Sequence, residues 1–178
     1  MTSAALANRG RMSGILLMLL GAWGSLVPFI GPYFGYAYTP DKAWAYTAGR
    51  LWLSVVPGAA AFLGGLLVAF SDRAAPTGAF LAVLGGIWFV IGEPVIALAR
   101  PGGAIAPGSP VVSHGAVFAA PTMRFLEALG FFYGLGVVVL FFAALALGEV
   151  LVARMAADRY RERMADTITP EDQYGPAY

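Results

Sequence analysis

The chain alternates between long apolar stretches and short stretches that contain its charged residues. No residue between Arg11 and Asp41 is charged, and residues 14–33 within this stretch are predominantly apolar. A helix that crosses about 30 Å of hydrocarbon needs roughly 20 residues, so residues 14–33 suffice for one crossing. Three later stretches are also predominantly apolar: 51–71 and 128–148, which have no charged residue, and 78–98, whose only charged residue is Glu93. The pattern predicts an all-α membrane protein with four transmembrane helices, arranged as two helical hairpins.

Two of the prolines inside these predicted helices lie near a helix end and predict irregularities there. Pro28 lies near the end of the first helix, and Pro94 follows Gly92 and Glu93 near the end of the third. Proline removes a backbone donor and clashes with the preceding turn. We therefore expect a kink or an early end after Pro28, and an interruption of the third helix at residues 92–94.

The fourth predicted helix continues beyond the membrane. Arg124 opens it, and charged residues resume at Glu149, after the apolar stretch. We expect the helix to end near Asp166 and to be followed by a flexible tail at 167–178. The polar segment before this helix, residues 99–121, is long for a loop, and loops of this length are usually functional or mobile.

These elements divide the chain into four parts. They are an N-terminal segment at 1–13, a first two-helix unit at 14–76, a second two-helix unit at 77–153 that contains the external loop, and an extension with a tail at 154–178. With four crossings, both termini lie on the same side of the membrane.

The basic residues predict which side that is, because Lys and Arg are enriched on the cytoplasmic side of membrane proteins. The side with the termini has seven: Arg9, Arg11, Arg73, Arg154, Arg159, Arg161 and Arg163. The other side has four: Lys42, Arg50, Arg100 and Arg124. Both termini are therefore expected in the cytoplasm. The basic residues are ten Arg and one Lys, a ratio that points to a GC-rich bacterial genome and hence to the bacterial cytoplasmic membrane.

Composition supports the membrane prediction and excludes several kinds of chemistry. The chain is 59% hydrophobic and 12% charged, whereas a soluble domain carries about 25% charged residues. It has no cysteine and one histidine, His114, so disulfides, thiolate metal sites and histidine-cluster metal sites are excluded within one chain. The net charge of +1 gives no basic field for nucleic acid, and no cofactor or catalytic motif is present.

The two hairpins resemble each other. Gly21-Ala22-Trp23 in the first helix aligns with Gly86-Ile87-Trp88 in the third, and a proline follows each tryptophan, at Pro28 and Pro94. The second and fourth helices align on Arg50 and Arg124. We expect a two-helix unit used twice, in parallel copies, because each unit contains an even number of crossings.

The first helix resembles the SPW-repeat family of small bacterial membrane proteins. In that family a Gly-x-Trp precedes a Ser-Pro-Trp in the first helix of a two-helix repeat. Here Gly21-Ala22-Trp23 precedes Val27-Pro28-Phe29, so Val27 replaces the serine and Phe29 the second tryptophan. The second copy has Glu93-Pro94-Val95 and one extra residue. The resemblance implies a multi-spanning membrane protein and supplies no activity.

Four charged residues near the outer ends of the helices are the candidate site: Arg50, Glu93, Arg124 and Glu127. A carboxylate near hydrocarbon is expensive, so it tends to be paired, protonated or functional. One hypothesis is a buried polar cluster that binds an ion, a lipid headgroup or a partner. The other is a structural ion pair that ties the two repeats together.

We expect a non-enzymatic structural or accessory membrane protein without a cofactor. Its partners would be the lipid bilayer and either further copies of itself or a larger membrane complex, met through the outer surface that Trp, Tyr and Phe make aromatic. The alternative is a small transporter or channel, favoured by Glu93, the arginines and the helix prolines. A lipid-modifying enzyme would need Glu93 or Glu127 as its acid or base.

Overall fold

The structure is a computed structural model that describes residues 3–38, 40, 42–99, 110–111 and 120–167 of the chain. Most of the predicted loop at 99–121, including His114, and nearly all of the predicted tail at 167–178 lie outside the described residues.

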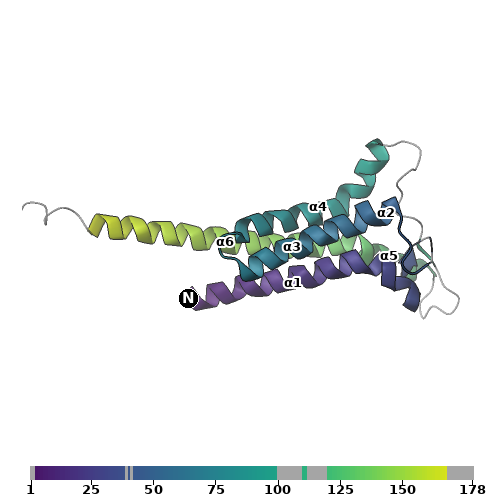
Figure 1. Cartoon of the computed structure of the whole chain (residues 1–178), viewed down its shortest axis with the longest axis horizontal. Helices are drawn as coiled ribbons and strands as arrows, with labels where there is room; N and C mark the ends of the chain where they lie inside the picture. Colours follow the sequence, from purple (N-terminus) through teal and green to yellow (C-terminus); the bar gives the residue numbers. More distant parts are fainter. Residues whose placement is uncertain (1–2, 39, 41, 100–109, 112–119, 168–178) are drawn as a thin grey trace, which may run out of the picture.

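Four long helical spans form an elongated bundle (Figure 1). The first is α1, Ser3–Ile30. The second consists of α2 (Ala48–Arg50), the π-helix η2 (Leu51–Val55) and α3 (Val56–Phe70). The third is α4, Ala75–Ala99, and the fourth consists of α5 (Ala120–Phe131) and α6 (Tyr133–Thr167). Among the described residues, these four spans are long and apolar enough to cross a membrane, which confirms the predicted fold class.

Each span packs on the next around the bundle. Contacts join α1 to α3, α3 to α4, α4 to α6 and α6 back to α1. Both α1 and the free part of α6 leave the bundle at one end, which we call the terminal end (Figure 1). The opposite end, where the connecting segments gather, is called the loop end.

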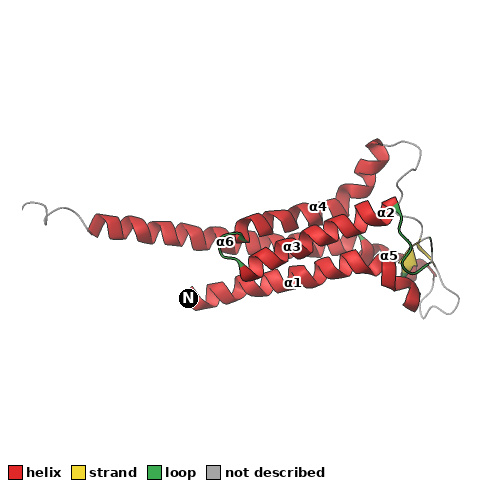
Figure 2. Ribbon diagram, in the orientation of Figure 1, coloured by secondary structure: helices red, strands yellow, loops and turns green. Residues whose placement is uncertain are grey.

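The loop end contains the little structure that lies outside the four spans (Figure 2). A short 3₁₀-helix, η1 (Gly31–Phe34), follows α1 directly. Strand β1 (Ala37–Tyr38) then pairs antiparallel with β2 (Pro110–Val111), with Ala37 opposite Val111 and Tyr38 opposite Pro110. This small sheet joins the segment after the first span to the segment before the fourth.

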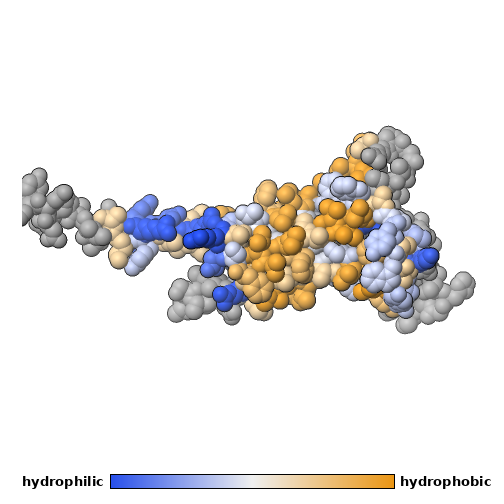
Figure 3. Space-filling model, viewed as in Figure 1, coloured by the Kyte–Doolittle hydropathy of each residue, from blue (hydrophilic) through white to orange (hydrophobic). Residues whose placement is uncertain are grey.

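Surface hydropathy follows the bundle. Hydrophobic residues cover its sides, whereas hydrophilic residues cover α6 where it extends past the terminal end (Figure 3). This distribution is consistent with an integral membrane protein whose four spans contact lipid.

Pro28 and Pro94 have different effects on their helices. Helix α1 ends at Ile30, two residues after Pro28, as predicted. Helix α4 instead continues through Pro94 to Ala99, so the predicted interruption is wrong. Its last turns bend away from the bundle (Figure 1). A membrane helix can bend at a proline without ending, because local adjustments satisfy the freed backbone groups.

The fourth span also differs from its prediction at its start. It begins at Ala120 and not at Arg124, and a turn at Phe132 interrupts it between α5 and α6. No charge marks this interruption, so the hydropathy pattern did not reveal it. The far end agrees with the sequence, since α6 ends at Thr167, one residue beyond the predicted end at Asp166.

Small residues let the spans approach closely. A Cβ atom added at Gly21 would lie 2.6 Å from the Gly58 carbonyl oxygen on α3, and one added at Gly14 would lie 2.8 Å from the Gly65 carbonyl oxygen. Both distances are too short for a real side chain, so the α1–α3 contact depends on glycine. Large apolar side chains fill the rest of the core, among them Leu17, Val27, Leu53, Phe89 and Phe131, each at most 2% exposed.

Candidate functional site

Arg50, the first of the predicted site residues, is buried in α2 at 4% exposure. Its guanidinium donates to three backbone carbonyls of the preceding loop: Pro40 at 2.6 Å, Lys42 at 3.2 Å and Ala45 at 3.1 Å. Thr47 Oγ1 accepts a hydrogen bond from the Arg50 backbone N–H at 3.1 Å and so caps the helix. The side chain fastens this loop onto the start of the second span.

Glu127 in α5 is fully buried and lies beside Tyr36. The Tyr36 hydroxyl donates to the Leu126 carbonyl at 3.0 Å and lies 3.4 Å from the Glu127 carbonyl. Its ring stacks on Phe131 with 4.9 Å between centroids. Burial and, second, the negative charge of Glu127 raise the pKa of Tyr36 to about 12 from 10.0. The hydroxyl therefore remains a donor that ties the segment after α1 to α5.

Glu93 lies on α4, and the Tyr133 hydroxyl on α6 donates to its Oε2 at 3.5 Å. The contact links the third and fourth spans near the loop end. The fourth predicted site residue, Arg124, lies in α5, but its side chain is outside the described residues. The predicted site residues thus share the loop end of the bundle.

A tryptophan on the third span donates a hydrogen bond to an irregular turn in the second span. In η2 the Val56 N–H donates to the Leu51 carbonyl, five residues back. In the same register the next carbonyl, that of Trp52, would face the nitrogen of Pro57, which has no hydrogen. The Trp88 indole Nε1 donates to the Trp52 carbonyl instead, at 2.8 Å.

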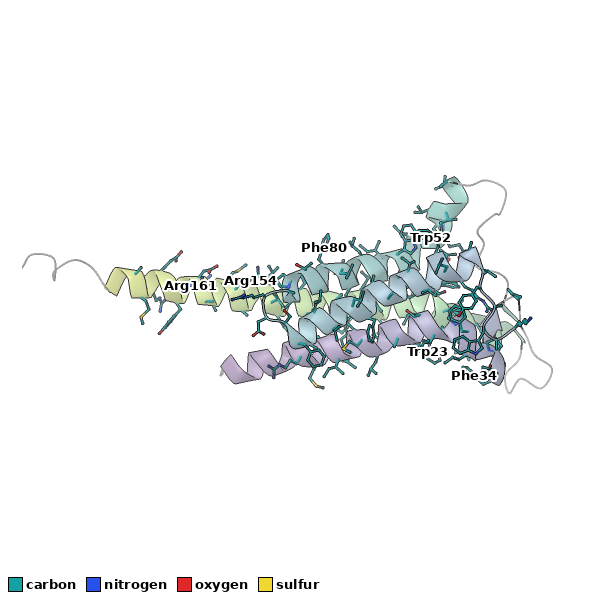
Figure 4. The ribbon with its side chains drawn as sticks, viewed as in Figure 1. Trp23, Phe34, Trp52, Phe80, Arg154 and Arg161 are labelled. Atoms are coloured by element: carbon teal, nitrogen blue, oxygen red, sulfur yellow. The ribbon has the colours of Figure 1, made fainter. Side chains whose placement is uncertain are left out.

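Trp23 on α1 likewise donates a hydrogen bond to a backbone carbonyl of the fourth span. Its indole Nε1 donates to the Gly130 carbonyl at 3.2 Å, next to the interruption between α5 and α6. Figure 4 shows Trp23 and Trp52 on different spans in the loop-end half of the bundle. Lipid offers no hydrogen bonds to a free carbonyl, so each indole stabilises an irregular turn in a span of the other hairpin.

The two tryptophan contacts lie at equivalent positions of the two hairpins, related by constant shifts along the sequence. Trp88 lies 65 positions after Trp23, and Gly130 lies 78 positions after Trp52. The same shifts relate pairs that are both almost fully buried: Leu17 with Ala82, Leu53 with Phe131, and Ala61 with Val139. Arg50 and Arg124 are only 74 positions apart. The contacts therefore align the second span with the fourth at a shift of 78 positions. This alignment differs from the one on the two arginines by four residues, which is about one helical turn.

A crevice of about 470 Å³ opens at the terminal end. Its walls come from the start of α1, the turn between α3 and α4, and α6. Two arginines and two carboxylates line it: Arg11, Asp72, Glu149 and Arg154. The Arg154 guanidinium also donates to the Arg73 carbonyl at 3.1 Å, which fixes α6 against the α3–α4 turn.

Helix α6 lines this crevice as far as Ala157 and then continues beyond the described part of the bundle. Every residue from 151 to 165 is exposed, and we call this segment the α6 extension. Figure 4 shows Arg154 near the base of the extension and Arg161 farther out along it. Among the described residues, no other helix or strand accompanies this part of α6 (Figure 1).

A second cavity of about 360 Å³ lies at the loop end between α1 and the start of the second span. Its lining is apolar and includes Phe29, Tyr46, Leu51 and Val55. Glu93 lines neither this cavity nor the crevice.

Sequence reasoning missed three features of these sites. Tyr36 is one of eight tyrosines, and nothing in the sequence places it against α5. Pro57, inside an apolar span, was the available signal for the irregular turn at Trp52. The crevice brings together charges from three separate segments, and sequence spacing cannot show that.

Comparison with known proteins gives no relative on which an assignment could rest. No protein-family model, no curated protein and no solved structure matches the chain significantly. The resemblance to the SPW-repeat family stays a prediction.

Proposed function

We propose that this chain is a non-enzymatic accessory or structural component of a membrane complex. The observation that supports this is the α6 extension, a helix of which every residue is exposed. Most helical stability in proteins comes from packing an apolar face against other elements. A partner that covers the extension supplies that packing.

The aromatic surface at the loop end is the other candidate for association. Tyr33, Tyr46 and Phe125 are 64–80% exposed there. Tyrosine also favours the lipid headgroup region, so lipid alone accounts for some of this exposure. Exposure of the α6 extension is better evidence for a protein partner than exposure at the loop end, because the charged residues of the extension place it outside the hydrocarbon.

The test is purification of the tagged chain in mild detergent at native expression, with size analysis and mass spectrometry of what accompanies it. A stoichiometric partner is expected. Tyr160→Asp on the extension should release the partner, whereas Glu162→Gln on the same helix should not. A particle that contains only this chain, in one copy, would overturn the accessory role.

We also infer that the two hairpins are repeats in the bacterial cytoplasmic membrane, with the terminal end in the cytoplasm. The reciprocal tryptophan bonds and the constant spacings support the repeat. The greater number of arginines at the terminal end supports the orientation. Membership of the SPW-repeat family belongs with this inference, since its motif includes Trp23 and Pro28.

A small transporter or channel is the second candidate. Irregular turns in the second and fourth spans favour it, because transporters build substrate sites at broken helices. Glu93 would then be the charged residue on the pathway. Flux of protons or small cations into liposomes should fall for Glu93→Gln if this candidate is correct. Unchanged thermal stability of Glu93→Gln would remove the structural role of this residue, and unchanged flux would remove its functional role.

A further inference from the structure

The α6 extension has a defined apolar seam. Ala153, Ala157, Tyr160 and Met164 follow one another at intervals of four, three and four residues. This is the spacing of the a and d positions of a coiled coil, which place one residue after another along a single helix face. All four residues are exposed.

The seam continues the core-facing side of the same helix. Val139, Ala143 and Ala146 precede it at the same spacing and are fully buried inside the bundle. Val150, the next residue in the series, lines the crevice. The face that packs on the other spans within the bundle therefore emerges at the terminal end, where no other helix among the described residues covers it.

The charges beside the seam have one sign. With Ala153 and Tyr160 at d positions, the e and g positions of the extension are Arg154, Ala156, Arg161 and Arg163. The carboxylates lie elsewhere, since Asp158 occupies a b position and Glu162 an f position. Residues at e and g meet the partner helix and set partner choice.

We infer that the α6 extension binds an acidic amphipathic helix of another protein. Apolar residues of that helix would pack on the seam, and its flanking carboxylates would pair with the arginines at the e and g positions. The crevice gives the partner helix room to begin at Ala153, beside the bundle. This inference rests on the proposed accessory role and names the chemistry of the partner.

A second copy of this chain is a poorer occupant. Two extensions packed in parallel would bring arginine-rich flanks together, and like charges at these positions repel. The acidic residues on the far faces could not offset this repulsion.

The experiment uses the full chain in detergent and synthetic helical peptides three heptads long as probes. All peptides have leucine at a and d, and they differ only at e and g, where one has Glu and the other Lys. Fluorescence anisotropy at low salt measures binding. The Glu peptide should bind at least about tenfold more tightly than the Lys peptide.

Matched variants locate the contact. The triple variant Arg154→Glu, Arg161→Glu, Arg163→Glu should reverse the peptide preference. Arg159→Glu, at a c position of the same segment, should leave it unchanged. Met164→Asp should weaken the binding of both peptides. A reversed preference is a gain of Lys-peptide binding, so it cannot come from misfolding.

Equal binding of the two peptides, or binding of neither, would overturn the inference. Self-association through the extension, seen as concentration-dependent dimers that Met164→Asp abolishes, would overturn it in favour of a second copy. Release of the Glu peptide by anionic vesicles but not by zwitterionic ones would favour a membrane surface as the occupant and overturn it too. A stoichiometric partner cross-linked elsewhere on the chain would leave the accessory role standing while this inference fails.

Discussion

The indole of Trp88 is expected to stabilise the second span, because it pairs a carbonyl that Pro57 leaves without a backbone donor. Trp88→Phe keeps an aromatic ring but removes the N–H, and it should lower the free energy of unfolding by about 1–3 kcal/mol. Pro57→Ala restores a backbone donor to the Trp52 carbonyl. Trp88→Phe should therefore lower the free energy of unfolding by less in the Pro57→Ala variant than in the parent chain.

A double-mutant cycle measures this coupling, with unfolding followed in detergent. Trp88→Phe, Pro57→Ala and the double variant are compared with the parent chain. Equal costs of Trp88→Phe in both backgrounds would show that the indole acts through packing and not through the bond to Trp52.

Tyr36 should make stability fall at alkaline pH. Its pKa is 10.0 in the unfolded chain and about 12 in the folded one, so the unfolded state loses the proton first as pH rises. Stability from this group is fully present below pH 10 and declines between about pH 10 and 12. Tyr36→Phe removes the titrating hydroxyl, so its melting temperature should fall less steeply across this window. Parallel declines in the two proteins would assign the loss to other groups.

The sequence singles out a few charged residues but does not show what they contact. Arg50, Glu93 and Glu127 are conspicuous because charges are rare in apolar surroundings. The Arg50 guanidinium donates to backbone carbonyls, and the Tyr133 hydroxyl donates to the Glu93 carboxylate. The Tyr36 hydroxyl donates to the backbone carbonyl of Leu126, beside Glu127. Such partners leave no charge pattern along the chain, so an ion-pair cluster was the natural but untested expectation.

At the scale of helices, the α1–α3 contact should tolerate no side chain at Gly21. A Cβ there would meet backbone atoms of Phe62 and the Gly58 carbonyl oxygen. Gly21→Ala should therefore destabilise the bundle by about 1–3 kcal/mol through overpacking. Gly148→Ala is the matched control, because a Cβ there meets nothing within 4 Å. It should be neutral or stabilising by up to about 1 kcal/mol. Equal melting temperatures for both variants would mean that α1 and α3 separate easily.

The spans were predictable and their irregular turns were not. Uncharged stretches of about 20 residues indicate membrane helices from length and polarity alone. The turn at Phe132 and the π-helix at 51–55 depend on tryptophans from the other hairpin, and hydropathy contains no information on such contacts. Pro94 misled the prediction because its helix bends and does not end there.

At the scale of the molecule, an even number of spans predicts that the start of α1 and the end of α6 lie at the same end of the bundle, and Figure 1 shows these two described ends there. The order of spans around the bundle was open, because hydropathy does not specify neighbours. It follows from the close glycine contacts of α1 with α3 and from the core shared by α4 and α6. The α6 extension was anticipated as a helix, whereas the continuity of its seam with the buried core required the structure.

The absence of cysteine makes the orientation directly testable. Tyr46→Cys places one thiol at the loop end, and Arg161→Cys places one on the α6 extension at the terminal end. Both side chains are exposed. A membrane-impermeant maleimide added to intact cells should label Tyr46→Cys and should leave Arg161→Cys unlabelled until the membrane is permeabilised, because the arginine-rich end stays in the cytoplasm. The reverse pattern would show that the arginine count misassigns the sides, and equal labelling in intact cells would contradict opposite ends separated by a bilayer.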